Sequence, residues 1–346
     1  MWLTSSSIGR KFIMALTGAC LVLFVTFHCV MNAIAICWPA AYNVICEFLG
    51  ANWYALVASL GLAALFVIHI IYALWLTIQN RNARGSVRYS VSSRPADVEW
   101  SSKNMLVLGI VVLAFLGVHL IQFWAKMQLQ EIRGVEGAIP PAAGTLFIQE
   151  AFSQPWTLIV YAIGFVALWF HMNHGFWSMF QSVGWDNNNW LPRLRKIGLW
   201  WTSVVIALFL VQGIVFTVKS NEGFYKTDAA LQKQYVDMIL SEMGQESTMQ
   251  NIEFADFAGM AHQLAAIPAE QLDMLIQQRQ IPFTSDQVNH IKGFVTYIEG
   301  ESVFNGEVSK LQAQFQMMQQ QMMMPQEAAP VAPSQEEVKV DSVANN

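Results

Sequence analysis

The sequence predicts an all-α integral membrane protein, a bundle of five transmembrane helices followed by a small helical and disordered C-terminal extension. Its 346 residues are 54% hydrophobic and only 12% charged, which is typical of membrane proteins. The charge is unevenly divided. Residues 1–220 carry 13 Lys/Arg and 7 Asp/Glu, a net charge of +6, whereas residues 221–346 carry 6 and 17, a net charge of −11. The two regions are therefore expected to face different solvents.

Five apolar stretches within residues 1–220 contain no Asp, Glu, Lys or Arg. Each is long enough to cross the hydrocarbon core as a helix, which takes about 20 residues. They are Phe12–Ile36, Trp53–Ile78, Met105–Trp124, Trp156–Phe180 and Ile197–Val218. The first stretch follows Arg10 and Lys11 as the core of a signal peptide would. Its uninterrupted apolar length exceeds such a core, so we interpret it as the first span.

Lysine and arginine residues are unequally distributed between the two sides that five spans define. Ten fall on the side of the N-terminus, and three, Lys126, Arg133 and Lys219, fall on the other. Because cytoplasmic loops are enriched in positive charge, we expect the N-terminus in the cytoplasm and the C-terminal extension outside.

The extension begins where hydropathy falls, after Lys219. Apolar residues recur at three- and four-residue spacing in Asp228–Met243, Ala258–Ile281 and Asp286–Tyr297, which predicts a helical extramembrane extension over residues 221–311. Residues 312–346 are rich first in Gln and Met and then in Pro, Ala, Glu and Val, a composition that predicts disorder. No basic run interleaved with aromatic residues occurs, so nucleic acid is not an expected partner.

The four cysteines, Cys20, Cys29, Cys37 and Cys46, form no Cys-x-x-Cys pair. This spacing supports neither covalent haem attachment nor a zinc ribbon. Packing is the expected role of Cys20 and Cys29. Cys37 and Cys46 flank the loop between the first two spans, where a disulfide is the alternative to two free thiols.

Histidines lie in four of the five spans, and an ionisable side chain in lipid indicates function. From the ends of their spans, His28 and His119 both lie about 10–15 Å from the predicted outer edge. His69 and His171 both lie roughly 25 Å from that edge. A single membrane histidine can simply hydrogen-bond between helices. Four helices with histidines at two matched depths favour a functional role.

Two facing imidazoles at each of two depths are what two six-coordinate haems require, because each iron takes one nitrogen from either side of the porphyrin. The outer pair is His28 with His119, and the inner pair is His69 with His171. A zinc ion would instead need three or four ligands at one point. His174 competes with His171, since residues three apart on a helix point in similar directions, but the depth favours His171.

Four residues near the cytoplasmic surface are candidates for contacts with a haem propionate. Lys11, Arg193 and Lys196 would contribute charge-assisted hydrogen bonds, and His174 would donate one from its imidazole. The alternatives are an ordinary topology charge for each basic residue and a bond to a neighbouring helix for His174.

Residues 5–220 also carry several short motifs around these histidines. They are Ser5-Ser6-Ser7 followed by Lys11, Met14-Ala15-Leu16-Thr17-Gly18 ahead of His28, then His69, His119 and His171-Met172-Asn173-His174-Gly175-Phe176-Trp177-Ser178. This pattern resembles the large cytochrome b subunit of succinate:quinone oxidoreductases (succinate dehydrogenases) and fumarate reductases, in the form with five helices and two haems. In similar proteins the fourth ligand is the histidine four residues before the glycine of the last motif, which favours His171. The acidic extension departs from the family pattern.

The resemblance implies a respiratory-chain anchor in a bacterial cytoplasmic (inner) membrane that binds two haem b and is not itself catalytic for the dicarboxylate. A flavoprotein subunit with FAD and an iron–sulfur subunit would dock on the cytoplasmic face, against Arg81–Lys103 and Arg193–Lys196. Electrons would pass between the iron–sulfur clusters and a quinone, menaquinone in two-haem members, through the inner and outer haems. Glu47, between spans one and two, is the candidate for accepting quinol protons, with a solvated loop carboxylate as the alternative.

Two rival hypotheses remain. Another di-haem b subunit, such as the anchor of a nitrate reductase or formate dehydrogenase, typically takes two ligands from one helix, whereas four helices here carry one each. A transporter or scaffold whose histidines only pack would contain no chromophore.

Overall fold

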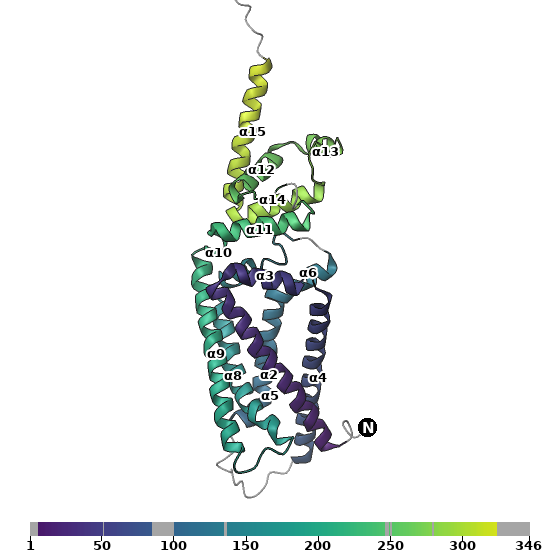
Figure 1. Cartoon of the computed structure of the whole chain (residues 1–346), viewed down its shortest axis with the longest axis vertical. Coiled ribbons are helices and arrows are strands. Elements are labelled where there is room, and N and C mark those ends of the chain that lie inside the picture. The colour runs from purple at the N-terminus through teal and green to yellow at the C-terminus, as the bar shows by residue number, and fades with distance from the viewer. Residues whose placement is uncertain are drawn as a thin grey trace, which may run out of the picture.

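The computed structural model describes residues 6–50, 52–84, 100–134, 137–245, 249, 251–278 and 280–323. Throughout these residues the regular structure is helical and no strand occurs, so the predicted all-α fold is confirmed. Figure 1 shows a tall bundle with a second helical body stacked on one end and a single long helix projecting from that body.

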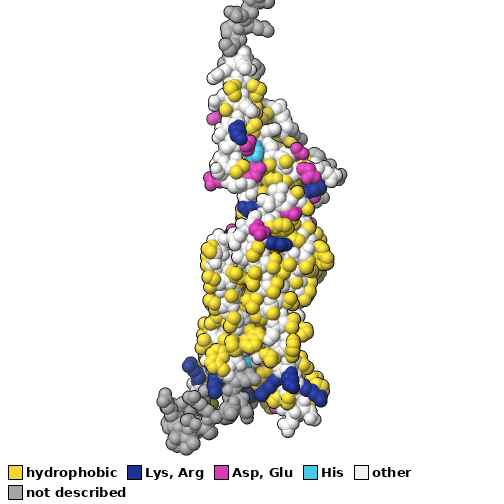
Figure 2. Space-filling model, turned by 90° about the vertical axis from the view of Figure 1, so that its left-hand side faces the viewer, with side chains coloured by type: hydrophobic (Ala, Val, Ile, Leu, Met, Phe, Trp, Pro, Cys, Tyr) yellow, Lys and Arg dark blue, Asp and Glu magenta, His cyan; other side chains and the backbone are white. Residues whose placement is uncertain are grey.

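Five helices of the bundle are long and apolar enough to cross a membrane. They are α2 (Ser7–Cys37), α4 (Trp53–Arg84), α5 (Trp100–His119) with its π-helical continuation η1 (Leu120–Trp124), α8 (Thr157–Gln181) and α9 (Leu191–Asn221). Large apolar side chains cover the outside of the bundle (Figure 2), among them Leu23, which is 68% exposed, and Trp200, which is 73% exposed. In water such a surface would be strongly unfavourable, so the surface identifies a multi-pass membrane protein.

Local sequence signals set the ends of these helices. Ser6 caps α2 by accepting a hydrogen bond from the backbone N–H of Gly9 (2.9 Å), the usual role of serine at a helix start. Pro192 lies in the first turn of α9, where a missing N–H costs nothing. The helix α9 begins six residues before the apolar stretch that predicts it, because basic residues continue the helix beyond the apolar segment.

Basic side chains gather at the end of the bundle that holds the N-terminus, which we call the basic end. Figure 2 shows them as a band of Lys and Arg below the apolar surface. The band includes Arg10 and Lys11 at the start of α2, Lys103 at the start of α5, and Arg193, Arg195 and Lys196 in the first turns of α9. The opposite end, which carries the second helical body, is called the extension end.

Three short helices lie at the extension end between the spans and the second body (Figure 1): α3 (Pro39–Gly50), α6 (Gln128–Arg133) and α7 (Gly144–Phe152). Both cysteines at this end are free thiols, Cys37 at the end of α2 and Cys46 within α3. The helix α3 makes up most of the segment between the first two spans.

The second body, residues 224–323, is the predicted helical extension. It comprises α10 (Phe224–Thr227), α11 (Ala229–Glu242), α12 (Phe254–Ala266), α13 (Ala269–Gln277), α14 (Ser285–Glu299) and α15 (Glu301–Met323). Asp228 caps α11, and Thr284 forms a capping box with Gln287 at the start of α14, as short polar side chains do at helix starts. Fully buried Phe257 and Phe294 belong to its core.

Two details of the extension differ from the sequence-based expectation. The segment predicted as one helical stretch, Ala258–Ile281, is divided into α12 and α13 at Ile267 and Pro268, because proline lacks the N–H that would continue a helix. The helix α15 extends to Met323, so residues 312–323, for which we expected disorder, are helical. Gln and Met both have good helix propensity. Residues 324–346 lie outside the described residues.

Buried polar groups join the extension to the bundle. Asn43 of α3 is fully buried, and its Oδ1 accepts hydrogen bonds from the backbone N–H (2.9 Å) and the hydroxyl (2.8 Å) of Thr145 in α7. Its Nδ2 donates to Oε1 of Gln234 in α11 (3.0 Å). Because such bonds in a dry interface are directional and costly to break, they fix α11 on the end of the bundle.

Candidate functional site

Four of the five histidines in the spans form two facing pairs, each contributed by two helices. In the outer pair, His28 of α2 and His119 of α5 have ring centroids 5.7 Å apart with planes at 84°. In the inner pair, the centroids of His69 of α4 and His171 of α8 are 6.3 Å apart with planes at 63°. Two imidazoles bound to opposite sides of one iron have centroids roughly 6 Å apart, because each metal–nitrogen bond is about 2 Å. Both separations fit that arrangement.

A hydrogen bond joins His69 to Thr17. The Thr17 hydroxyl lies 3.1 Å from Nδ1 of His69, and it donates its own proton to the carbonyl of Ile13 (2.9 Å). In the tautomer with its hydrogen on Nδ1, His69 donates to this oxygen and keeps the lone pair on Nε2. This is the arrangement that second-shell partners impose on metal-ligating histidines.

His119 in the outer pair is held in the same way. The Tyr161 hydroxyl of α8 lies 3.1 Å from Nδ1 of His119 and donates to Oε1 of Gln122 (2.9 Å). It therefore accepts from Nδ1 of His119 and leaves the lone pair on Nε2. Each pair thus contains one imidazole whose Nε2 lone pair is available to bind a metal.

The partners of these two histidines have different surroundings. The Nδ1 atom of His171 is buried and makes no hydrogen bond within the described residues, and a buried polar atom without a partner is uncommon unless something binds near it. Nε2 of His28 lies 3.0 Å from Nδ2 of Asn32, one turn along α2. Because an amide N–H₂ only donates, this nitrogen of His28 is an acceptor, and iron binding there would replace the Asn32 contact.

Glycines allow close approach beside the inner pair. A Cβ added at Gly18 of α2 would lie 3.5 Å from the His69 ring, and one added at Gly109 of α5 would lie 3.7 Å from the His171 ring. Both distances are ordinary van der Waals contacts, so these glycines pack directly against the two imidazoles. The facing imidazoles of the two pairs, at the separations given above, fit two haems.

The structure separates His171 from His174. His171 faces His69, whereas the ring of His174 packs edge-on against Trp177, with centroids 4.9 Å apart. The hydroxyl of Ser182 donates to the backbone carbonyl of Lys11 (3.4 Å), and the Lys11 side chain is exposed at the basic end. Neither His174 nor Lys11 belongs to a facing pair.

Glu47 is exposed on α3 and is not part of the contacts around the outer pair among the described residues. The α3 residue that reaches this pair is Tyr42, whose hydroxyl donates to Oδ1 of Asn32 (3.2 Å). Asn32 in turn contacts His28. The role of Glu47 in accepting quinol protons stays a prediction.

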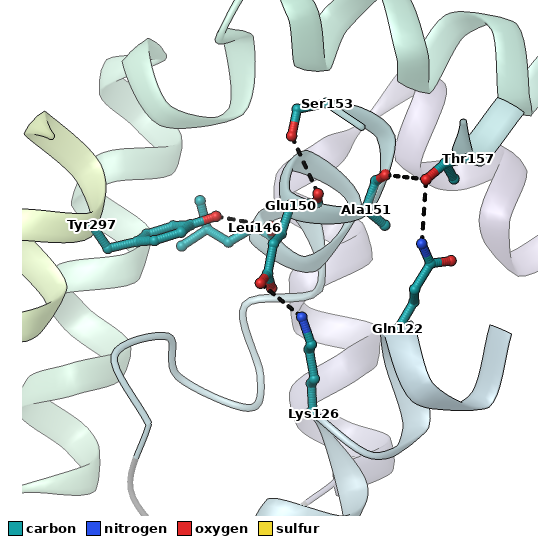
Figure 3. Close-up of polar contacts among 8 residues, drawn as sticks. All are labelled: Gln122, Lys126, Leu146, Glu150, Ala151, Ser153, Thr157 and Tyr297. Atoms are coloured by element: carbon teal, nitrogen blue, oxygen red, sulfur yellow. Dashed lines mark hydrogen bonds and ion pairs between the residues drawn. The ribbon is translucent and has the colours of Figure 1, made fainter. Parts of the chain in front are cut away.

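A hydrogen-bonded chain leads from His119 towards the extension end. Gln122 accepts from Tyr161 and donates through Nε2 to the hydroxyl of Thr157 (3.3 Å), which donates to the carbonyl of Ala151 (2.6 Å). Figure 3 shows the last part of this chain, with Lys126 paired to Glu150 (2.7 Å) at the same end. Gln122 lies in η1, which begins directly after His119. Single-turn π-helices often occur at functional sites.

Thr17, Asn32, Gln122 and Tyr161 are the supporting residues that sequence reasoning missed. Each is a polar residue within a predominantly apolar span, which is the available signal, because polar groups in lipid need a partner. Sequence spacing does not define how each helix is rotated about its axis, so the partner of each residue was not predictable.

Fold and site together define a multi-pass helical membrane protein that encloses two facing histidine pairs. Comparison with known proteins found no matching family model, no matching curated protein and no matching solved structure. The assignment of function therefore depends on the geometry of these pairs.

Proposed function

We propose that this chain is the di-haem cytochrome b anchor of a succinate:quinone oxidoreductase or quinol:fumarate reductase. The observation that carries the proposal is the facing of imidazoles in two pairs on four helices, at 5.7 and 6.3 Å. In each pair, one hydroxyl orients one histidine so that its Nε2 is available to iron. Bis-histidine ligation of this kind is typical of electron-transferring b haems.

Bound haem would supply one-electron redox chemistry at each pair, and the residues of this chain would position it. His28 and His119 would hold the outer haem, and His69 and His171 the inner haem. Thr17 and Tyr161 would fix the rings of His69 and His119 by accepting from Nδ1, which also raises the basicity of the ligating nitrogen.

The proposed orientation places the basic end in the cytoplasm and the extension outside, because positive charge is retained on the cytoplasmic side. In a bacterial cytoplasmic membrane, the iron–sulfur and flavoprotein subunits would dock at the basic end. The inner pair lies nearer that end and the outer pair nearer the extension end. Electrons would thus reach a quinone, which we propose to be menaquinone, through both pairs in sequence.

The Tyr42 and Asn32 contacts place polar groups between His28 and the surface helix α3. These groups, together with the Tyr161–Gln122–Thr157 chain, are better placed than Glu47 to exchange protons with a quinone near the outer pair. We therefore assign Glu47 the role of a solvated carboxylate.

The experiment is to purify the full chain, tagged at its N-terminus, with its partners from the native membrane. Succinate should reduce the b-type absorbance, fumarate should reoxidise it, and both responses should disappear when the flavoprotein subunit is removed. Reduction by formate or oxidation by nitrate, without a response to dicarboxylates, would instead identify another di-haem respiratory anchor and overturn the proposal.

A further inference from the structure

Helices α8 and α9 enclose an open cavity of about 200 Å³ at the basic end, lined by Asn173, Trp177, Arg195, Lys196 and Leu199. The cavity does not belong to the histidine pairs. Each residue of an α-helix turns about 100° around the axis, so Asn173 points to the opposite side of α8 from His171. That side faces α9.

The cavity contains polar atoms that lack partners. Trp177 is only 7% exposed, and its Nε1 makes no hydrogen bond to any described residue. Nε of Arg195 and Oδ1 of Asn173 are likewise buried and make no hydrogen bond within the described ranges. Buried donors are normally paired. Two of these three atoms are donors, so the missing partner is a hydrogen-bond acceptor.

Charge narrows the chemistry of that acceptor. The guanidinium of Arg195 lies 4.4 Å from the centre of the Trp177 ring, so this side chain is turned into the cavity. The neighbouring Arg193 is turned away and stacks on Trp190 at 5.6 Å. Arg195 and Lys196 bring two positive charges to the cavity, and no acidic residue occurs among the described side chains that line it. A phosphate group is the ligand that a guanidinium and neighbouring N–H donors prefer.

The position of the cavity indicates what kind of molecule would carry the phosphate group. Leu199 is the apolar residue of its lining, and the nearby α9 residues Trp200 (73% exposed) and Ile197 (49% exposed) lie on the outer surface of the bundle. The lining therefore combines basic residues with an apolar one, at the end of the bundle where the basic band meets the apolar surface. Figure 2 shows that band and that surface. Basic pockets between transmembrane helices at this depth bind anionic lipid head groups.

We propose that this cavity binds the phosphodiester head group of an anionic phospholipid, with its acyl chains along α9. The indole N–H of Trp177 and the guanidinium of Arg195 donate to the phosphate oxygens, and Lys196 neutralises the remaining charge. This inference does not depend on the presence of haem.

The test uses native mass spectrometry of the detergent-solubilised full chain, titrated with phosphatidylglycerol, phosphatidylcholine or inorganic phosphate. Wild type should retain one phosphatidylglycerol. Arg195→Gln and Trp177→Phe should each lower the affinity about tenfold, because each removes a hydrogen bond to a charged group. Arg193→Gln, which removes the same charge two residues away, should retain the lipid. Arg195→Lys keeps the positive charge and should give an intermediate affinity. This result would show that the loss in Arg195→Gln does not come from misfolding.

Four results would overturn the assignment. Equal loss in Arg193→Gln would reduce the effect to surface charge, and equal retention of phosphatidylcholine would show that no anionic lipid is selected. Binding of inorganic phosphate alone, with the same dependence on Arg195, would make the ligand a soluble anion. Loss of a haem in Arg195→Gln would make it a haem propionate.

Discussion

The hydroxyl of Tyr161 lies 3.1 Å from Nδ1 of His119 and donates a hydrogen bond to Oε1 of Gln122. This relationship connects α8 to a histidine of α5 and sets the direction of the hydrogen bond. Tyr161→Phe removes the acceptor and leaves the ring volume nearly unchanged, so we expect the outer haem alone to bind about 10–100-fold more weakly. Haem titration of the apoprotein with redox potentiometry measures this. Equal weakening of both haems would show that Tyr161 acts on the whole bundle.

Thr17 has the corresponding role in the inner pair. Thr17→Val keeps the shape of the side chain but removes the oxygen that accepts from His69. The midpoint potential or occupancy of the inner haem should change while the outer haem keeps both. Thr26→Val is the matched control, because Thr26 donates to the Val22 carbonyl in the same helix and contacts no paired histidine. A change in the outer haem with Thr17→Val would contradict the pairing.

His171 and His174 are distinguished by what each faces. Because His171 faces His69 and His174 packs on Trp177, His171→Ala should abolish the inner haem, and His174→Ala should leave two haems per chain. Reduced-minus-oxidised spectra of both purified variants test this directly. Retention of the inner haem in His171→Ala together with its loss in His174→Ala would reverse the assignment.

Asn43 should stabilise the docking of the extension. Asn43→Ala leaves the backbone N–H of Thr145 in a buried interface without its acceptor, whereas the Thr145 hydroxyl keeps its bond to the Tyr235 hydroxyl (2.7 Å). We expect a loss of about 1–3 kcal/mol in the free energy of unfolding. Thermal unfolding in detergent and the rate of proteolysis between α9 and α11 measure it. Asn305→Ala, at an exposed position of α15, should change neither. An unchanged melting temperature for Asn43→Ala would show that the Asn43 hydrogen bonds do not stabilise the docking of the extension.

Much of this architecture was predictable because lipid imposes simple rules. A span needs about 20 residues without charge, and a rise of about 1.5 Å per residue converts sequence position into depth. These two rules give the five spans. They also give the pairing by depth of His28 with His119 and of His69 with His171, which the structure places side by side.

Other features depend on information that depth does not contain. The contact of Tyr161 with His119 requires the rotation of α5 and α8 about their axes, which the depth of a residue does not define. The helices α3 and α7 contain few charges and lie where a loop was expected, since Asn43 and Thr145 satisfy each other only after folding. Residues 312–323 have a low-complexity composition and yet continue α15, because propensity does not require sequence complexity.

The most direct test of the central claim is the haem content of the purified full chain, measured as pyridine haemochrome, together with single replacements of the four paired histidines. The account predicts two haem b per chain. His28→Ala and His119→Ala should lose the same haem, and His69→Ala and His171→Ala the other. A colourless protein, a single haem, or losses that cross between the pairs would contradict it.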